Sequence, residues 1–253
     1  MFPFQLTLSV KLDKVNAGYY ANLYFYNETT KALEFQQTVI VGADGKTEFV
    51  FDNASEYAIV VDDISHAPWS NPFTDVQDSS WFYPDVAFVH QNGLFAGTSA
   101  TTFAPQTSMT RGMVVTVLGR LAGVGVADYS GASFDDVNTA QYYAPYVKWA
   151  AEMGIVNGVG DNKFAPDANI SRQDLAVILN NYADKLGIKM KQTLQVVMFA
   201  DSDLIADYAT DAVGNMVRAG VINGNPDGMF APKANATRAE VAAMLHRFVE
   251  AAQ

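Results

Sequence analysis

Three arginines stand at matching places in this 253-residue chain and could hold an anion. Arg111, Arg172 and Arg238 each directly follow a serine or threonine, and they lie 61 and 66 residues apart. An apolar pattern with helical spacing begins at each of these sites, so the hydroxyl is predicted to cap a helix whose first residue is the arginine. That end of the helix dipole favours acids by roughly 0.3–1 kcal/mol, so three bases at equivalent positions require partners.

Two kinds of partner would explain the arginines. One is a structural ion pair with an upstream aspartate, for which Asp75, Asp136 and Asp201 are the candidates. The other is an anion site, where the guanidinium and the free amides of the first helical turn converge on one carboxylate or phosphate. An arginine held by an aspartate still has donors left for a ligand, so both interpretations stay open.

The arginines belong to a unit that occurs three times. The tripeptide Phe-Ala-Pro stands at residues 103–105, 164–166 and 230–232. A glycine precedes it in a short polar loop of every copy: Gly97, Gly158 and Gly224. A hydroxyl residue follows it as the predicted helix cap: Thr110, Ser171 and Thr237. Each unit also has an earlier amphipathic helix that ends at a glycine, and one unit has too little apolar surface to fold alone, so three copies are predicted to share a core.

These copies resemble S-layer homology (SLH) repeats over about residues 73–253. The third copy is the closest, with Gly-Asn-Pro-Asp-Gly-Met-Phe-Ala-Pro at 224–232 followed by Thr-Arg-Ala-Glu at 237–240, and Trp81 resembles the aromatic start of the family's first helix. The resemblance implies a pseudo-threefold trimer of repeats around a three-helix bundle. It also implies an extracellular, non-catalytic anchor at the cell wall or S-layer. Grooves between repeats would bind a secondary cell-wall polysaccharide bearing a pyruvate ketal, with the arginines near its carboxylate.

The residues that we expect to contact or shape this ligand site recur in the three copies. They are Arg111, Arg172, Arg238, Thr110, Ser171, Thr237, Trp81, Gly97, Gly158, Gly224, Asp75, Asp136 and Asp201. The first copy has Met113 where the third has Glu240, and Tyr142 and Tyr208 replace Trp81 in the other copies. We therefore expect the three grooves to be inequivalent. The alternative function is structural: assembly with other surface-layer proteins, with weak or no glycan binding.

Residues 1–64 have a different pattern. Apolar and polar residues alternate over 4–12, and residues 21–26, 33–41, 49–51 and 57–61 read as four further strands of a small antiparallel sheet or sandwich. The predicted fold class is thus α+β in two parts: a β module at 1–64, a linker at 65–72, and repeats at 73–133, 134–198 and 199–253. Met1 leads directly into a strand without a leader, so we expect a fragment that lacks the signal peptide of a larger exported protein.

Composition excludes several classes of function. The formal net charge of -11 disfavours nucleic acid and anionic membranes as partners, and no apolar run reaches the roughly 18 residues of a membrane span. Cysteine is absent, and His66, His90 and His246 have no partners at metal-ligand spacing. Nucleophile, phosphate-loop and zinc motifs are also missing from the sequence, so we expect no enzyme activity, no metal and no cofactor.

Overall fold

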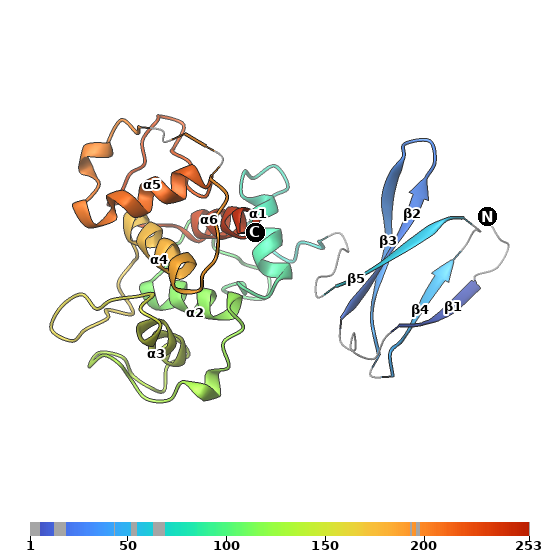
Figure 1. Cartoon of the computed structure of the whole chain (residues 1–253), viewed down its shortest axis with the longest axis horizontal. Coiled ribbons are helices and arrows are strands. Elements are labelled where there is room, and N and C mark those ends of the chain that lie inside the picture. The colour runs from blue at the N-terminus through green and yellow to red at the C-terminus, as the bar shows by residue number, and fades with distance from the viewer. Residues whose placement is uncertain are drawn as a thin grey trace. The chain divides into compact units, whose positions relative to one another are not determined.

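The computed structural model describes residues 6–12, 19–42, 44–51, 55–62, 69–192, 194–195 and 198–252. Residues 4–5 of the first predicted strand, His66 and the first half of the predicted linker, residues 65–68, lie outside these ranges. The chain divides into two compact units, Met1–Ser70 and Asn71–Gln253, which Figure 1 draws in blue to cyan and in teal to red.

The first unit is the small antiparallel β region that the alternating pattern predicted. Its strands are β1 (Leu6–Lys11), β2 (Tyr20–Asn27), β3 (Ala32–Ile40), β4 (Lys46–Phe51) and β5 (Tyr57–Asp62). Strand β1 pairs with β4, and β2 lies between β3 and β5 in a three-stranded sheet. Ala21, Leu23, Val41 and Phe49 form the buried core of this unit, because inward-facing positions alternate with outward ones along each strand.

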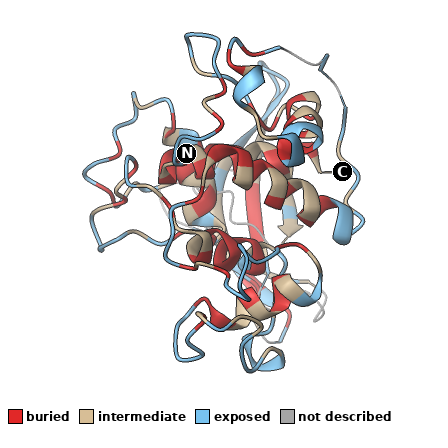
Figure 2. Cartoon of the chain, turned by 90° about the vertical axis from the view of Figure 1, so that its left-hand side faces the viewer, coloured by how far each residue is buried: buried red, intermediate tan, exposed pale blue. Residues whose placement is uncertain are grey.

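The second unit is helical, with two longer helices in each repeat. They are α1 (Tyr83–Gln91) and α2 (Arg111–Leu121) in repeat 1, α3 (Ala144–Glu152) and α4 (Arg172–Lys185) in repeat 2, and α5 (Thr210–Arg218) and α6 (Arg238–Ala251) in repeat 3. Short 3-10 segments also occur: η2 (Val126–Asp128), η3 (Ser202–Leu204) and η4 (Asp207–Ala209). Helix α3 packs on α2, α5 packs on α4, and α1 packs on α6. The first helix of every repeat thus packs on the second helix of another, and buried residues line the facing sides of the helices (Figure 2).

Local signals fix where these helices begin and end. The side chains of Thr110, Ser171 and Thr237 each accept a hydrogen bond from the amide three residues later, as predicted for N-caps. The side chain of Glu240 in turn accepts a hydrogen bond from the Thr237 amide, which completes the capping box of α6. After α1, α3 and α5 the chain turns at a left-handed glycine, with φ of 64°, 70° and 75° at Gly93, Gly154 and Gly220.

Three backbone hydrogen bonds join the repeats in a closed cycle. The amide of Met109 donates to Ala236, that of Ala236 to Ile170, and that of Ile170 to Met109, each at 2.9 Å. These residues are at most 1% exposed, so the bonds lie in the interior, where leaving a backbone group unpaired would be costly. Each repeat therefore donates one bond to a second repeat and accepts one from the third.

The longest helices in the described part of the chain, α4 and α6, have 14 residues each. None of the described helices combines the length and the apolar character needed to cross a membrane.

Candidate functional site

The three arginines bind the Phe-Ala-Pro segments of neighbouring repeats. The Nε atom of each donates to a phenylalanine carbonyl oxygen: Arg111 to Phe164 at 2.9 Å, Arg172 to Phe230 at 2.7 Å, and Arg238 to Phe103 at 2.8 Å. Each guanidinium also lies over the ring of the same phenylalanine, 4.6–5.3 Å from its centroid. Repeat 1 thus reaches repeat 2, repeat 2 reaches repeat 3, and repeat 3 returns to repeat 1.

A second donor of each arginine is also engaged. Nη2 of Arg111 donates to the Asn157 carbonyl at 3.1 Å, and Nη2 of Arg238 donates to that of Ala96 at 2.7 Å. Arg172 differs, because its Nη1 forms an ion pair with Glu240 at 2.5 Å. Burial lowers the pKa of Arg238, and the negative charge of Asp75 offsets part of this effect. The arginine stays protonated at neutral pH.

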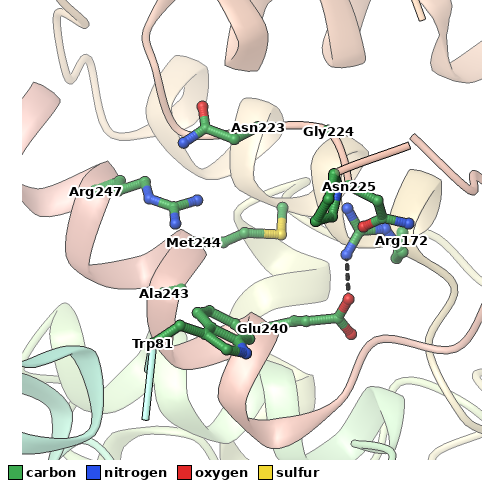
Figure 3. A pocket seen from close by; sticks show the side chains of 10 residues that line it. Trp81, Arg172, Asn223, Gly224, Asn225, Glu240, Ala243, Met244 and Arg247 are labelled. Carbon is green, nitrogen blue, oxygen red and sulfur yellow. Dashed lines mark hydrogen bonds and ion pairs between the residues drawn. The ribbon is translucent and has the colours of Figure 1, made fainter. Parts of the chain in front are cut away.

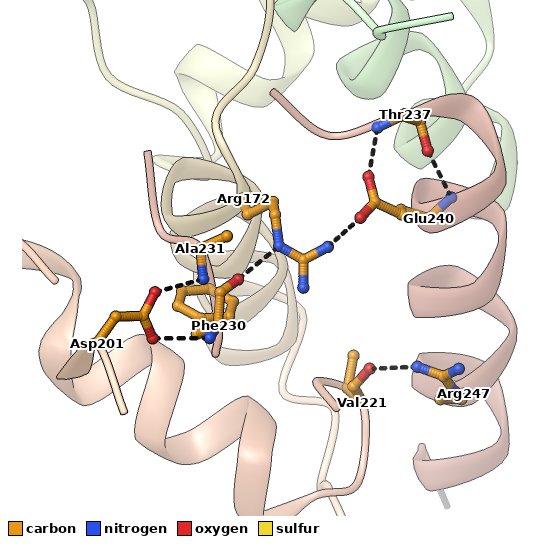
Figure 4. Close-up of polar contacts among 8 residues, drawn as sticks. All are labelled: Arg172, Asp201, Val221, Phe230, Ala231, Thr237, Glu240 and Arg247. Atoms are coloured by element: carbon orange, nitrogen blue, oxygen red, sulfur yellow. Dashed lines mark hydrogen bonds and ion pairs between the residues drawn. The ribbon is translucent and has the colours of Figure 1, made fainter. Parts of the chain in front are cut away.

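The ion pairs between the arginines and the upstream aspartates, one of the two interpretations that the sequence left open, do not form in the described part of the chain. Each aspartate instead accepts two backbone amide bonds of 2.7–2.8 Å from the Phe-Ala-Pro segment of its own repeat. The carboxylate of Asp75 binds the amides of Phe103 and Ala104, Asp136 those of Phe164 and Ala165, and Asp201 those of Phe230 and Ala231. An arginine therefore holds the phenylalanine carbonyl while an aspartate holds the adjoining amides, as Figure 4 shows for Arg172 and Asp201.

This clamp holds a strained backbone. Ala104, Ala165 and Ala231 have φ of 59°, 56° and 55°, in the left-handed region that costs an alanine roughly 1–2 kcal/mol. Burial works to raise the pKa of Asp136, but its bonds from the Phe164 and Ala165 amides outweigh that effect and hold the pKa below its ordinary value. The carboxylate of Asp136 is thus ionised at neutral pH and stabilises the turn that presents the Phe164 carbonyl.

The loop glycines allow a close approach to an aromatic ring. A Cβ atom at Gly224 would lie 2.7 Å from the ring of Phe199, and one at Gly97 would lie 2.6 Å from that of Phe73. At Gly158 the nearest obstacle is the Lys163 carbonyl, at 2.7 Å. A side chain does not fit at these positions, so packing alone requires glycine in each loop.

One open groove combines residues of all three repeats. Its volume is about 310 Å³, and its walls include Trp81 of repeat 1, Arg172 of repeat 2, and Gly224, Glu240 and Arg247 of repeat 3 (Figure 3). We call it groove A. Trp81 is 59% exposed, which is unusual for so large an apolar side chain and leaves its ring available to a partner.

A second groove, groove B, has the same construction from residues one repeat earlier. Its volume is about 540 Å³, and it is lined by Arg111 of repeat 1, Gly158, Asp174 and Asn181 of repeat 2, and Tyr208 of repeat 3. Arg111 corresponds to Arg172 of groove A, Asp174 to Glu240, and Tyr208 to Trp81. Repetition of one arrangement by different repeats distinguishes these grooves from incidental surface hollows.

The two grooves differ in how their polar groups are paired. In groove B the hydroxyl of Tyr208, which is 63% exposed, donates to Asp174 at 2.7 Å and accepts from Gln173 at 2.9 Å. Burial and the bond to Asp174 both raise the pKa of Tyr208, so the phenol stays neutral. In groove A the corresponding acid, Glu240, is paired with Arg172 instead.

The third set of equivalent residues consists of Arg238, Gly97, Tyr142 and Met113. Tyr142 is 55% exposed, as its counterparts are. Each arginine reaches into another repeat, and Glu240 of repeat 3 pairs with Arg172 of repeat 2. By the same relation, Met113 of repeat 1 takes the place of this acid for Arg238 of repeat 3, and not for Arg111. The departure of the first copy from the pattern therefore affects the surroundings of Arg238.

The sequence patterns did not point to one recurring position. The residue ten places after each cap lies on the second helix and donates to a backbone carbonyl of its own repeat. Arg120 binds Leu94 at 3.0 Å, Asn181 binds Ile155 at 3.2 Å, and Arg247 binds Val221 at 3.5 Å. The available signal was a polar residue on an otherwise apolar helix face in all three copies.

Comparison with known proteins matches the repeats to one family. The sequence model of the S-layer homology domain matches residues 72–112, 133–176 and 199–242. An amylopullulanase of Thermoanaerobacterium thermosulfurigenes is 29% identical over 248 residues, which are 98% of this chain and 13% of that protein. An endoglucanase of Bacillus sp. (strain KSM-635) is 32% identical over 69% of this chain and 18% of its own length.

A third relative, a cellulosome-anchoring protein of Acetivibrio thermocellus, is 28% identical over 58% of this chain and 33% of its own length. The chain thus spans no more than a third of any of these three relatives. The similarity to the amylopullulanase also extends through the β unit, because it covers nearly the whole chain.

Proposed function

Since this chain belongs to the S-layer homology family, we propose that its repeats anchor a larger surface protein to the bacterial cell wall without catalysis. A cell-surface location follows from that membership. Two of the relatives carry enzyme names and one is an anchoring protein, and the similarity covers only a small part of each. Attachment is the role that such different proteins could share through one module.

The ligand of the grooves is a secondary cell-wall polysaccharide that carries a pyruvate ketal. The observation that carries this proposal is the recurrence of an exposed aromatic ring, an arginine and a glycine loop from three different repeats in both grooves. Aromatic rings suit the apolar faces of sugars, and a guanidinium suits the ketal carboxylate. The net charge of -11 does not prevent this, because short-range contacts are screened far less than the overall field.

The proposed ligand contacts fall on Trp81, Tyr142 and Tyr208 and on the motif arginines, of which Arg172 and Arg111 line grooves A and B. The caps Thr110, Ser171 and Thr237, the loop glycines and the aspartates take part by fixing the backbone around each groove. Glycan binding is assigned to the groove, so a substitution at a cap should weaken it only modestly.

The architecture belongs to the same proposal: a pseudo-threefold trimer of repeats with α2, α4 and α6 as a central three-helix bundle. The three-way hydrogen-bond cycle and the three arginine contacts support it, since both visit the repeats in order and return to the first. Rings of Tyr182 on α4 and Phe248 on α6 are also in contact, with centroids 5.7 Å apart.

Sedimentation with purified cell walls tests the function. The chain should pellet with intact walls and should stay in solution with walls from which the secondary polysaccharide has been extracted. Equal pelleting with both would contradict the proposal. Self-association without any wall would instead favour the structural role in a surface layer.

A further inference from the structure

Groove A holds two arginines in very different settings. Arg172 is only 5% exposed, its Nε binds the Phe230 carbonyl, and its Nη1 pairs with Glu240. Its charge is therefore largely neutralised inside the protein. A ligand carboxylate would have to compete with Glu240 for this guanidinium, which weakens any contact it could make.

Arg247 is half-buried, and its guanidinium makes fewer contacts within the protein than that of Arg172. Its Nη1 makes a single long bond of 3.5 Å to the Val221 carbonyl, and within the described part of the chain it forms no ion pair. Figure 3 shows its guanidinium reaching over Met244 toward the loop that carries Asn223. The remaining donors can meet a carboxylate in the two-pronged geometry that a guanidinium favours.

The wall between Arg247 and Trp81 suits a sugar ring. Ala243 and Met244 lie between the two side chains on α6, and all four line groove A (Figure 3). This gives an apolar strip with an exposed indole at one end and a guanidinium at the other. A sugar lying on the strip would bring a charged substituent to Arg247.

We propose that Arg247 is the residue of groove A that binds the carboxylate of an acidic sugar, while Arg172 holds repeats 2 and 3 together. This inference rests on the proposed glycan-binding function. It identifies the guanidinium by which groove A distinguishes an acidic sugar from a neutral one. Groove B has Asn181 at the corresponding position, and the charge of its Arg111 is opposed by the nearby carboxylate of Asp174, which also lines the groove. Groove A thus prefers an acidic sugar, whereas groove B shows little preference between acidic and neutral sugars of the same polymer.

The structure itself supplies a matched variant. Asparagine at this position in repeat 2 still binds a backbone carbonyl, so Arg247→Asn should keep the corresponding bond to Val221 and leave the fold intact. The reciprocal change, Asn181→Arg, places a second guanidinium in groove B. Both variants are made in the full chain, and unchanged thermal unfolding confirms that they are folded.

The test is calorimetric titration with two synthetic probes: a monosaccharide with a pyruvate ketal, and the same sugar without it. The wild type should prefer the ketal sugar. Arg247→Asn should weaken ketal-sugar binding about ten- to a hundredfold and leave binding of the neutral sugar unchanged. Asn181→Arg should give groove B the preference for the ketal sugar that groove A has.

Other results would overturn the inference in distinguishable ways. If Arg247→Asn keeps the wild-type preference, the carboxylate is bound elsewhere, although glycan binding stands. If the wild type binds both probes equally, groove A does not recognise the carboxylate and the inference is wrong. Sedimentation with walls then still tests the anchoring function separately. If the wild type binds neither probe and does not pellet with walls, both the inference and the proposed function fail.

Discussion

The Nε atom of Arg238 donates a hydrogen bond of 2.8 Å to the carbonyl oxygen of Phe103, which lies 135 residues earlier in the chain. This contact joins the last repeat to the first. Its counterparts, from Arg111 to Phe164 and from Arg172 to Phe230, join the other two pairs. Each motif arginine thus links two repeats through a hydrogen bond.

Replacing Arg238 with lysine should destabilise the protein. Lysine keeps the charge but has no donor at the Nε position, so the Phe103 carbonyl loses its charged partner in a buried site. The expected loss in unfolding free energy is about 1.5–3 kcal/mol, measured by urea denaturation. The more exposed Arg218→Lys is the control and should change stability little. Unchanged stability in Arg238→Lys would show that the bond from Arg238 to the Phe103 carbonyl contributes nothing to the free energy of unfolding.

Asp201→Asn tests the clamp on the third Phe-Ala-Pro segment. The carboxylate now accepts bonds from the amides of Phe230 and Ala231, whereas an asparagine would turn its NH₂ group toward one of them. We expect a loss of about 2–3 kcal/mol in thermal or urea unfolding. Asp203→Asn, at an exposed site nearby, is the control. A stability equal to that of the control would mean that the strained alanine does not depend on the carboxylate.

Deleting repeat 3 should abolish cooperative folding of the other two. A chain ending at residue 198 loses α6, on which α1 packs, and it loses the Phe230 carbonyl that Arg172 binds. The remaining helices should bind hydrophobic dyes and show no sharp thermal transition. A chain of residues 71–253, which lacks only the β unit, is the control and should unfold in one transition. A sharp transition in the shortened chain would argue against mutual dependence of the repeats.

Alkaline pH should destabilise the protein through Tyr182. Burial raises the pKa of Tyr182 to about 12, since its ring packs between Trp149 and Phe248. The neutral phenol is favoured in the folded state, so its stabilising effect is complete below about pH 10 and is lost as the pH rises from 10 toward 12. Urea unfolding at pH 8 and pH 11 should show a smaller pH effect in Tyr182→Phe. The same pH dependence in both proteins would assign the effect to other groups.

The sequence by itself determined the local structure of each repeat. The hydroxyl caps at Thr110, Ser171 and Thr237, the glycines that end the first helices, and the five described strands of the first unit were all readable. These features depend on residues within a few positions of one another, where capping and backbone preferences act directly. The repetition also gave the family, because three copies of a specific pattern seldom arise by chance.

Only the tertiary structure decided which partners the charged side chains take. Arg172 and Asp201 look like a natural ion pair in sequence, yet they hold opposite sides of the same tripeptide. The tertiary structure also assembled each groove from three repeats and set Arg247 apart from Arg172. The physical reason is that charge and hydrogen-bonding capacity are properties of a residue, whereas the partner of a motif arginine depends on which segments, 53 to 135 residues apart, the fold brings within 3 Å.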